Sequence, residues 1–557
     1  MDMDYKRIFL YVSIFLVSLL LWNAWQKDYP IEKTVTQTVA QNNSTTATTN
    51  SAFIPPTTTA TVTGDKSQQQ TSAVETTPTS RQIQIKTDVL QITLDKLGGD
   101  LIESDLLKFP IEKNSKTPIT LFSQEQGKIY LAQNGIATAE QTQRILFQAN
   151  QDHYELTPGE KTLTVKLTGK LPSGIEVEKD YVFTAGTYLI EVNYRLANPA
   201  SKTWQGQLYH QIVRQKPEGE KSGLFHMTSY TGASISDPKE KLYENVSFSH
   251  MQEQALSRNV TGGWIAMQQH YFVSAWVPPS DQQSRFYSNA APNNLFTIGL
   301  MGPPIELKAG QSYTTQMKLF VGPEITSILK PIAPGLNLTV DYGFLWFISV
   351  IVFWLMKQIY NVVGNWGWAI ILVTVFIKLA FYKLSATSYR SMANLKKLQP
   401  KMEAIKQRFA DDKQKLSQAT MELYKKEKIN PLGGCLPILV QLPVFIALYW
   451  VLLESVELRQ APFIFWIQDL SIADPYYILP IIMGVSMFIQ QKRNPPPPDP
   501  TQAKVMMLLP VLFTFIFLHF PAGLVLYWVV NNVLSIAQQW YITQKIEPSK
   551  KVKPAQS

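Results

Sequence analysis

Five long apolar runs crowd the last third of this 557-residue chain and constrain its fold more than any other feature. They occupy residues 366–382, 435–453, 476–489, 505–520 and 524–536. Runs of this kind suit helices that cross the hydrocarbon core of a bilayer, which is about 30 Å thick. The mean hydropathy of -0.06 conceals them because the N-terminal half is polar. The sequence therefore predicts a multi-pass membrane protein.

The first 25 residues have the pattern of an N-terminal anchor. Two basic residues, Lys6 and Arg7, precede the apolar stretch 8–22, and the sequence Asn-Ala-Trp stands where a cleavage site would need small side chains. We interpret residues 1–25 as an uncleaved transmembrane signal anchor. A removable signal peptide is the alternative, since the apolar stretch is short.

The composition of residues 26–80 is that of a linker. Between residues 34 and 80 there are 16 threonines among 47 residues and almost no large apolar side chains. Such a segment cannot bury enough surface to offset the conformational entropy of ordering it. We predict a disordered tether rich in Thr, Ser and Gln.

Residues 81–334 show the two-residue periodicity of β-strands. The clearest run has an apolar side chain at every second position, namely Tyr188, Ile190, Val192, Tyr194 and Leu196. Further strand-like segments recur along this range between Gly and Pro turns, which favours a large antiparallel β-sandwich. The histidines of this range form no H-x-H or H-E-x-x-H group, so we expect no metal or hydrolase site there.

The distribution of charge predicts the topology. Residues 385–430 hold 11 Lys and Arg against five acids, whereas residues 454–474 hold one base against four acids. With a cytoplasmic N-terminus, five C-terminal spans place 385–430 and the C-terminal tail inside, as the positive-inside rule requires. The net charge of +9 then reflects membrane orientation rather than nucleic-acid binding. A sixth apolar run, 342–356, would reverse every loop if it spanned, so we expect an amphipathic helix along the outer interface.

The basic segment 386–430 is predicted to be a helical hairpin in the cytoplasm. Apolar residues recur at helical spacing before the pair Asp411-Asp412 and again after it, with charged residues on the other faces. A solvated connection that merely joins two spans is the alternative interpretation.

The sequence lacks the motifs that would power an enzyme or a transporter. It has no G-x-x-x-x-G-K phosphate loop, no G-x-S-x-G elbow and no histidine–carboxylate cluster. The five runs contain no Asp or Glu, although ion-coupled transporters usually need an intramembrane carboxylate. The single cysteine, Cys435, excludes an intrachain disulfide. We expect no catalytic residue, no metal and no cofactor.

The apolar runs do contain uncharged polar residues, which need water or protein partners at membrane depth. These are Gln441, Gln490, Asn531 and Asn532. Arg390 follows the first run within a stretch of small polar side chains. It is either one more positive-inside anchor or part of a polar groove that opens to the cytoplasm.

Four segments, in order, resemble the YidC membrane protein insertase family. They are YRSMANLKKLQPKM at 389–402, NPLGGCLPILVQLPVFIALY at 430–449, DPYYILPIIMG at 474–484 and FPAGLVLYWVVNN at 520–532. The leading anchor and the large β-domain resemble the Gram-negative form of the family. In that form the β-domain is a periplasmic supersandwich, a fold shared with sugar-binding enzymes.

The resemblance implies a five-helix core around a hydrophilic groove that opens to the cytoplasm and to lipid. Arg390 matches the groove arginine of the family, and Trp528 matches an aromatic groove residue that meets the client chain. Gln441 and Gln490 are expected to line the same groove. The hairpin 386–430 resembles the cytoplasmic loop that receives clients and ribosomes.

These interpretations predict an α-helical membrane protein, with an N-terminal anchor and a five-helix insertase core, that carries a large periplasmic all-β domain. The expected parts are an anchor (1–25), a linker (26–80), the β-domain (81–334), an interfacial helix (335–363), the core (364–545) and a basic cytoplasmic tail (546–557).

The expected function is to insert, fold and help assemble proteins of the bacterial inner membrane, alone or with the Sec translocon. The expected partners are nascent membrane-protein clients, the Sec translocon, the lipid bilayer, and the ribosome through the hairpin and the basic tail, without sequence-specific nucleic-acid binding. The alternative is a membrane-anchored periplasmic enzyme of the mutarotase type or a glycan-binding protein.

Overall fold

The computed structural model describes residues 51–52, 72–73, 81–138, 144–217, 229–409, 412–427, 436–494 and 500–546. The chain divides into two units, Met1–Thr49 and Asn50–Ser557. The predicted anchor lies outside the described residues, as does the predicted basic tail beyond its first residue. Within the predicted linker, strands β1 (Ser51–Ala52) and β2 (Ser72–Ala73) pair antiparallel, and the other residues of 26–80 lie outside the described part.

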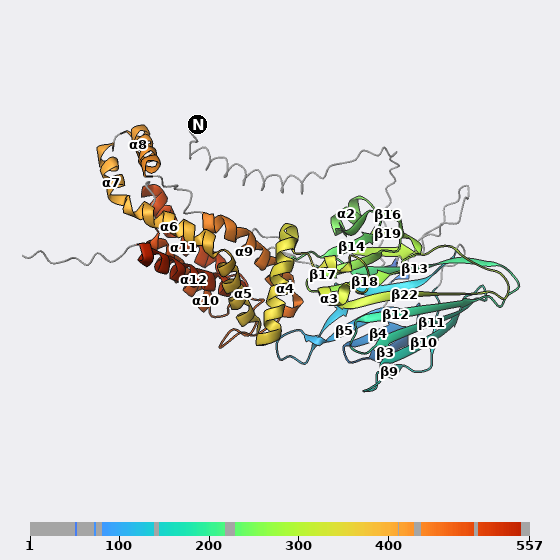
Figure 1. Ribbon diagram of the computed structural model, residues 1–557. Helices are drawn as coiled ribbons and strands as arrows, with labels where there is room; N and C mark the ends of the chain where they lie inside the picture. Colours follow the sequence, from blue (N-terminus) through green and yellow to red (C-terminus); the bar gives the residue numbers. More distant parts are fainter. Residues whose placement is uncertain are drawn as a thin grey trace, which may run out of the picture. The chain divides into compact units, whose positions relative to one another are not determined.

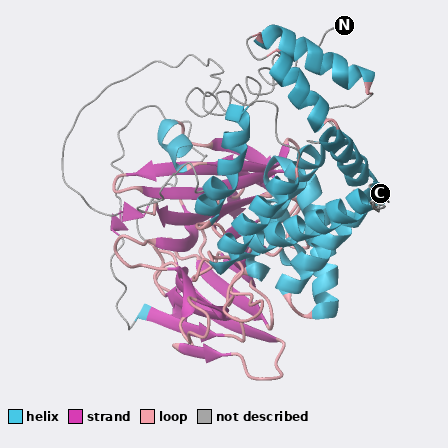
Figure 2. Ribbon diagram, turned by 90° about the vertical axis from the view of Figure 1, so that its left-hand side faces the viewer, coloured by secondary structure: helices cyan, strands magenta, loops and turns pink. Residues whose placement is uncertain are grey.

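Two sheets make up the β-domain (Figures 1 and 2). The first has the order β15-β14-β17-β18-β22-β12-β11-β10-β8. Its strands are β8 (Gln148–Ala149), β10 (Thr162–Lys170), β11 (Glu176–Thr184), β12 (Leu189–Ala197), β14 (Gly232–Asp237), β15 (Lys241–Val246), β17 (Trp264–Gln269), β18 (Phe272–Val277) and β22 (Ser312–Pro323).

The second sheet has the order β16-β19-β20-β13-β7-β5-β4-β3-β9, with β21 paired to β13 and β6 paired to β5. Its strands are β3 (Gln82–Lys86), β4 (Leu90–Asp95), β5 (Asp100–Pro110), β6 (Pro118–Phe122), β7 (Tyr130–Ala137), β9 (His153–Glu155), β13 (Trp204–Gln215), β16 (Ser257–Thr261), β19 (Gln283–Ala291), β20 (Leu295–Met301) and β21 (Ile305–Leu307).

Alternating side chains explain how the first sheet forms its core. In β12 the apolar residues Ile190, Val192, Tyr194 and Leu196 are all buried, which confirms the periodicity predicted for this segment. The strand pairs with β11 on one side and β22 on the other, both antiparallel. A period of two sends one face of each strand into the interior, so a single core fills the space between the sheets.

Helices form the C-terminal part, and each of the five apolar runs falls on them. They are η2 (Leu336–Thr339), η3 (Gly343–Leu345), α4 (Trp346–Val363), α5 (Trp366–Ala380), α6 (Tyr382–Lys397), α7 (Gln399–Arg408), α8 (Lys413–Lys426), α9 (Leu436–Glu454), η5 (Val456–Leu458), α10 (Ile478–Arg493), α11 (Pro500–Phe517) and α12 (Ala522–Ile546). Two short helices, α2 (Phe248–Glu253) and α3 (Thr326–Leu329), lie within residues 81–334.

Length and hydropathy alone select few of these helices as full spans. Among the described residues they select Gly343–Val363, and a second span if α5 and α6, which meet at a bend of 69°, count as one. The helix α10 has 16 residues, or about 24 Å at 1.5 Å per residue, and α12 carries several polar side chains. The five-span core therefore stays a prediction, because its helices are shorter or more polar than a simple span.

The helix α4 covers the run that the sequence assigns to the outer interface. Ser349 on one face donates a hydrogen bond of 3.1 Å to the carbonyl oxygen of Ala447 in α9. The opposite face is exposed and apolar, with Phe347, Ile351 and Trp354. Figure 1 shows α4 running across the direction of α10 and α12. This arrangement agrees with an interfacial helix, although the composition of α4 also suits a span.

Candidate functional site

A line of polar side chains along α12 forms the centre of the helical bundle. Asn532, Ser535 and Gln539 are buried, and Asn531 is partly buried. Asn532, Ser535 and Gln539 follow one another at spacings of three and four residues, which places them on one side of the helix. Each of the four residues makes a hydrogen bond that the structure describes, and the partners come from several helices.

The partners of α12 show which helices surround its polar side. The amide of Asn531 donates to Gln441 Oε1 of α9 at 3.4 Å, and the amide of Asn532 donates to Ser486 Oγ of α10 at 2.9 Å. The hydroxyl of Ser535 donates to the carbonyl oxygen of Asn531 at 2.7 Å. The structure thus brings predicted Gln441, Asn531 and Asn532 together in one polar cluster.

Lys378 of α5 is the charged member of this cluster. Its side chain is 8% exposed, and Nζ donates a hydrogen bond of 2.7 Å to Ser535 Oγ. No ion pair among the described residues includes Lys378. Burying a charge in an apolar environment is costly, so an ionisable residue at membrane depth marks a functional site.

Lys378 was missed by the sequence analysis, which looked in the apolar runs for acids. It is the one charged residue in the run 366–382 and could have been found by that signal. Arg390, by contrast, is exposed and lies on α6, beyond the bend after α5. Gln490 is partly buried near the end of α10. The structure shows no contact of Arg390 or Gln490 with the cluster among the described hydrogen bonds.

Trp528 of α12 belongs to a group of aromatic side chains that come from α9, α11 and α12. The Trp528 ring contacts Phe445 of α9 edge-on at 4.6 Å between centroids, and Phe517 of α11 at 5.3 Å. The indole Nε1 of Trp528 is buried and has no hydrogen-bond partner among the described residues. An unpaired buried donor costs about 1–3 kcal/mol, which a ligand carbonyl at this position would recover.

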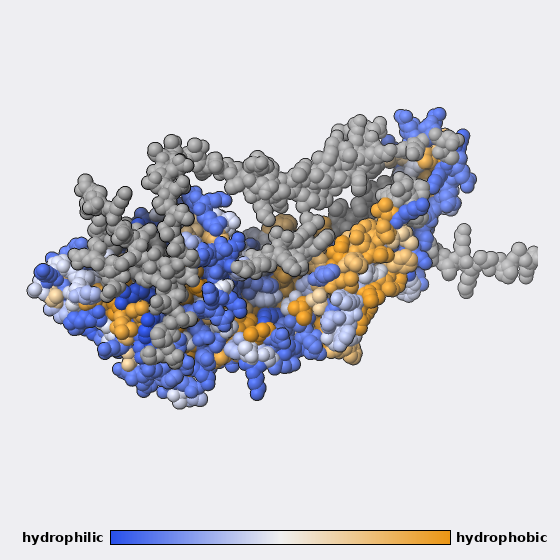
Figure 3. All heavy atoms as spheres, turned by 180° about the vertical axis from the view of Figure 1, so that it is seen from behind, coloured by the Kyte–Doolittle hydropathy of each residue, from blue (hydrophilic) through white to orange (hydrophobic). Residues whose placement is uncertain are grey.

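The outer surface of the bundle is apolar, whereas its interior holds the polar cluster beside buried apolar residues such as Val373, Leu448 and Leu524. Figure 3 shows this hydrophobic surface over the helical part. Its members include Leu379 on α5, Val485 on α10, and Leu508, Val511 and Phe515 on α11. So many large apolar side chains on the outside of a helical bundle are unusual for a soluble domain and suit a bilayer.

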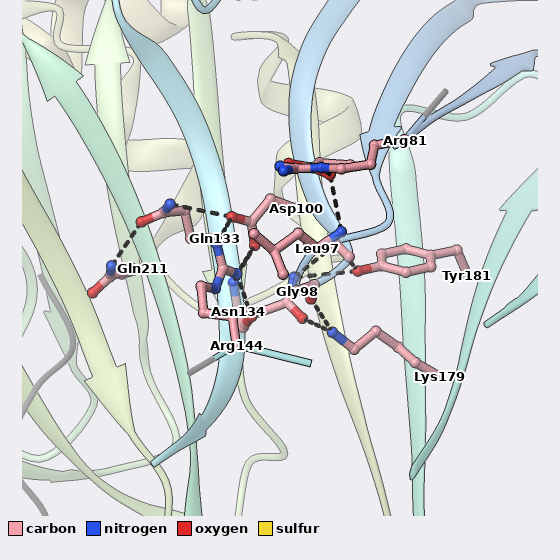
Figure 4. Close-up of polar contacts among 12 residues, drawn as sticks. Arg81, Leu97, Gly98, Asp100, Gln133, Asn134, Arg144, Lys179, Tyr181 and Gln211 are labelled. Atoms are coloured by element: carbon pink, nitrogen blue, oxygen red, sulfur yellow. Dashed lines mark hydrogen bonds and ion pairs between the residues drawn. The ribbon is translucent and has the colours of Figure 1, made fainter. Parts of the chain in front are cut away.

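The β-domain contains a second buried polar cluster, shown in Figure 4. Lys179 of β11 reaches across the sandwich and donates to the carbonyl oxygen of Gly98 at 2.7 Å and to Asn134 Oδ1 at 2.5 Å. The guanidinium of Arg144 pairs with both carboxylate oxygens of Asp100. Burial lowers the pKa of Lys179 to about 7.

The turn before β5 presents its carbonyl groups to this second cluster. Gly98 and Gly99 both have positive φ, 86° and 71°, which glycine adopts without steric cost. Tyr181 donates to the carbonyl oxygen of Gly99. Because the polar groups around Lys179 bond to one another across the two sheets, the cluster braces the sandwich rather than leaving groups free for a substrate.

No group of three or more potential metal ligands was found within the described residues. Within the described part of the helical site, the indole of Trp528 and the ammonium group of Lys378 are hydrogen-bond donors, whereas metal ions prefer acidic oxygens or thiolates. Donors of this kind are chemically suited to polar or anionic groups.

Two family models match successive parts of the chain. The model described as "60Kd inner membrane protein" matches residues 358–550, and the model described as "YidC periplasmic domain" matches residues 82–355. Together they cover both the helical part and the β-domain.

Full-length relatives in other bacteria are similar throughout. The membrane protein insertase YidC of Legionella pneumophila (strain Lens) is 52% identical over 560 residues, which cover 99% of each chain. The protein of the same name from Coxiella burnetii (strain Dugway 5J108-111) is 47% identical over 555 residues, with 98% of each chain covered.

Solved structures give lower similarity. A crystal structure of an active YidC insertase with its first transmembrane domain resolved is 19% identical, with a TM-score of 0.38, and covers 83% of this chain and 92% of that one. A galactose mutarotase-like protein from Lactobacillus casei is 11% identical, with a TM-score of 0.31, and covers 43% of this chain and 99% of that one. On the full-length relatives and the two family models, the chain belongs to the YidC membrane protein insertase family.

Proposed function

We propose that this chain inserts membrane proteins of the bacterial inner membrane through a polar groove built on α12 and centred on Lys378. The observation that carries the proposal is that Lys378 is buried within a polar cluster, inside a bundle whose outer surface is apolar. The full-length similarity to proteins named membrane protein insertase supports the same function.

The mechanism follows from the physics of solvation. A polar client segment loses hydrogen bonds to water when it enters about 30 Å of hydrocarbon. The amide and hydroxyl groups of Asn531, Asn532 and Ser535 replace part of that water. They thereby shorten the distance over which the client segment has no hydrogen-bond partner. Transfer of the client's apolar helix from the groove into lipid then drives insertion through the hydrophobic effect. No nucleotide is consumed in this scheme.

Lys378 supplies the electrostatic part. A unit positive charge about 4 Å from a client carboxylate contributes about 1 kcal/mol in water and about 4 kcal/mol at an effective dielectric constant near 20. We assign this role to Lys378 because it lies within the cluster. Arg390 is then a residue of the groove entrance, exposed on α6, where acidic client tails arrive first.

Trp528 and Gln441 complete the client-binding surface. The unpaired indole N–H of Trp528 donates to a client carbonyl group, and Gln441 offers its amide to the client backbone. Gln490, near the cytoplasmic end of α10, is assigned to the mouth of the groove. These contacts are polar and not specific for sequence, as an insertase with many clients requires.

The proposal is tested by insertion of clients that differ only in tail charge. Purified variants Lys378→Ala, Lys378→Arg and Arg390→Ala are reconstituted in vesicles, and insertion is measured by protease protection. We expect Lys378→Ala to slow acidic-tailed clients about tenfold, equivalent to about 1.4 kcal/mol, and Lys378→Arg to retain activity. Arg390→Ala, which removes a charge at the exposed groove entrance, should slow the same clients less than Lys378→Ala. Equal insertion of all clients by all three variants would reject the proposed electrostatic role of Lys378.

The proposed topology places the β-domain in the periplasm and the α7–α8 hairpin and the C-terminus in the cytoplasm. It rests on the excess of basic residues in 385–430. A reporter fused at Lys413 should be cytoplasmic and one fused near Gly364 periplasmic. Reporters on the same side would show that the number of spans between them is even.

We further propose that the hairpin receives ribosomes and that the helical core acts beside the Sec translocon on larger clients. An exposed ion pair links the two helices of the hairpin, since Nζ of Lys401 in α7 lies 2.6 Å from Oε1 of Glu427, just after α8. The remaining basic residues of the hairpin form a surface for ribosomal RNA phosphates. Co-sedimentation with ribosomes should fall steeply as salt rises, and Lys425→Glu with Lys426→Glu should weaken it further.

The β-domain, in this proposal, performs no catalysis. Its buried polar groups around Lys179 are bonded to one another across the sheets. An assay of sugar mutarotation should therefore give the same rate with the full-length protein and with buffer. A rate above buffer that Lys179→Met abolishes would favour the enzyme alternative.

A further inference from the structure

The connection between α9 and α10 exposes a group of apolar side chains that the groove does not use. Its most exposed member is Phe465, with 80% of its surface accessible, followed by Tyr476 with 66%. Ile464, Ile472 and Tyr477 are also exposed. Large apolar residues gathered in this way mark an interaction site.

Phe465 stands at the tip of a tight turn. The backbone N–H of Ile467 donates to the carbonyl oxygen of Ile464 at 3.2 Å, and that of Phe463 donates to Ile467 at 3.0 Å. Phe465 has φ of 53°, in the left-handed region that costs a bulky residue about 1–2 kcal/mol. The amide of Gln468 holds this conformation by donating to the Phe465 carbonyl oxygen at 2.9 Å. The turn therefore holds Phe465 in a strained backbone conformation in which its aromatic ring is exposed.

The rest of the connection forms a rigid base for this turn. The side-chain amide of Asn365, at the start of α5, donates to the carbonyl oxygen of Phe463 at 3.2 Å. Gly367 lies against the Phe463 ring so closely that a Cβ at this position would clash with it. The backbone N–H of Ala522, at the start of α12, donates to Ile472 at 2.7 Å. The connection that carries Phe465 is thus bonded to the starts of α5 and α12 through Phe463 and Ile472.

Asp474 holds the other end of the exposed group. Its side chain is 1% exposed and accepts hydrogen bonds from Trp466 Nε1 at 3.0 Å and from the backbone N–H of Tyr476 and Leu479. The other acid, Asp469, accepts from Ser471. Both carboxylates are therefore occupied by local donors, and neither is directed to a charged partner.

The chemistry of the surface points to lipid. Within the connection itself the sequence has no Lys or Arg between Arg459 and Lys492. Lys113 of the β-domain approaches the turn, and its Nζ is hydrogen-bonded to the Gln468 carbonyl oxygen at 3.0 Å and to Gln468 Oε1 at 2.8 Å. Exposed apolar side chains also follow on α10, where Ile481 and Val485 lie four and eight residues after Tyr477 and therefore on the same side of the helix. Aromatic residues that border a lipid-facing surface are typical of the level of the headgroups.

We propose that the turn carrying Phe465 is a hydrophobic wedge that enters the headgroup–acyl boundary of the bilayer and anchors the α9–α10 connection there. The wedge sets the depth and tilt of α10, which supplies Ser486 to the polar cluster. The proposal uses the membrane position of α10 and does not depend on how the groove binds clients.

The test measures the depth of a nitroxide label in vesicles of neutral phosphatidylcholine. Phe465→Cys is made in a Cys435→Ser background, so that the label occupies one site in full-length protein. Leu146→Cys is the matched control, since Leu146 is an exposed aliphatic residue of the β-domain, 60% accessible. Accessibility to oxygen and to a water-soluble nickel complex gives the depth. We expect the label at 465 to lie about 5–10 Å into the boundary and the label at 146 to lie in water.

Tyr476→Cys provides a second reporter should the turn not tolerate a change at 465. Its label should also lie within the boundary. Labels at 465 and 476 that are as accessible to nickel as the label at 146 would overturn the proposal. Burial of these labels only after ribosome–nascent chains are added would assign the surface to clients. Dipolar broadening between labels of two copies would assign it to a dimer. Either of the last two results also rejects the lipid wedge, and neither affects the groove.

Discussion

Two buried lysines, one in each part of the protein, occupy opposite electrostatic situations. Lys179 in the β-domain has two carbonyl-type acceptors within 2.7 Å and lies near the Asp100–Arg144 pair. Lys378 in the helical core has the hydroxyl of Ser535 as its described hydrogen-bond acceptor. A satisfied buried network rigidifies a fold, whereas a sparsely partnered charge keeps its capacity to bind another group. Lys179 therefore stabilises the β-domain through its hydrogen bonds, whereas Lys378 in the helical core keeps the capacity to bind another group.

The largest expected effect is a loss of folding stability when Lys179 is removed, and this loss distinguishes Lys179 from Lys378. Lys179→Ala leaves the carbonyl of Gly98 and Oδ1 of Asn134 without their donor and opens a cavity, so it should destabilise the β-domain by about 3–5 kcal/mol. Limited proteolysis of the full-length protein in urea measures this loss. Insertion per folded molecule should be unchanged. A Lys179→Ala protein as resistant to proteolysis as the parent would contradict the assigned brace.

Lys378→Met should show the opposite combination. Removing a sparsely partnered buried charge leaves stability unchanged or raises it by about 1 kcal/mol, because its desolvation cost disappears. Insertion of acidic-tailed clients should nevertheless fall about tenfold, or about 1.4 kcal/mol. Thermal aggregation in detergent and protease protection of clients measure the two quantities. If stability and insertion fell together, Lys378 would be a structural residue like Lys179.

The pH dependence of stability should follow Lys179. Burial lowers its pKa from 10.5 to about 7, so between these values the unfolded chain binds a proton that the folded chain does not. The free energy of unfolding should therefore rise with pH from 7 to 10.5, by up to about 1.4 kcal/mol per pH unit. Hydrogen exchange of β11 amides, corrected for intrinsic rates, measures this slope. Lys179→Met should flatten it, and an unchanged slope in that variant would refute the assignment.

The smallest effect is expected from removing the β-domain. Deleting residues 81–320, while keeping the chain from Asp341, leaves Lys378 and its partners in place. Insertion by the truncated protein should stay within about twofold of the parent, a difference of about 0.4 kcal/mol. The amount of inserted client per molecule of truncated protein is the measurement. Complete loss of insertion by a stable truncated protein would move the essential site into the β-domain.

Much of the fold could be predicted from the sequence because local patterns report which side of an element is buried. The alternation from Tyr188 to Leu196 matches the burial of β12, and the five apolar runs all fall on helices. The linker assignment of residues 26–80 stays a prediction, and within that range Ser51–Ala52 and Ser72–Ala73 pair as short strands. Composition reports the average behaviour of a segment and does not detect a pairing of two residues.

The candidate site could be predicted only in part. Gln441, Asn531 and Asn532 stand out in the sequence because amides are unusual in apolar runs, and the structure brings them together. Lys378 was passed over although its charge interrupts an apolar run, because an acid was the expected signal of function. Arg390, matched to the family motif, is exposed and stays a prediction.

The sequence by itself determined which residues are apolar or polar along each helix and strand, and it determined the family through four ordered motifs. Tertiary structure alone decided the partners. Asn531 and Asn532 are adjacent in the chain, yet one donates to α9 and the other to α10. Successive residues on a helix point about 100° apart, so the period of a sequence gives the direction of each side chain. Which helix lies in that direction depends on how segments far apart in the sequence pack together. A local sequence pattern does not contain that information.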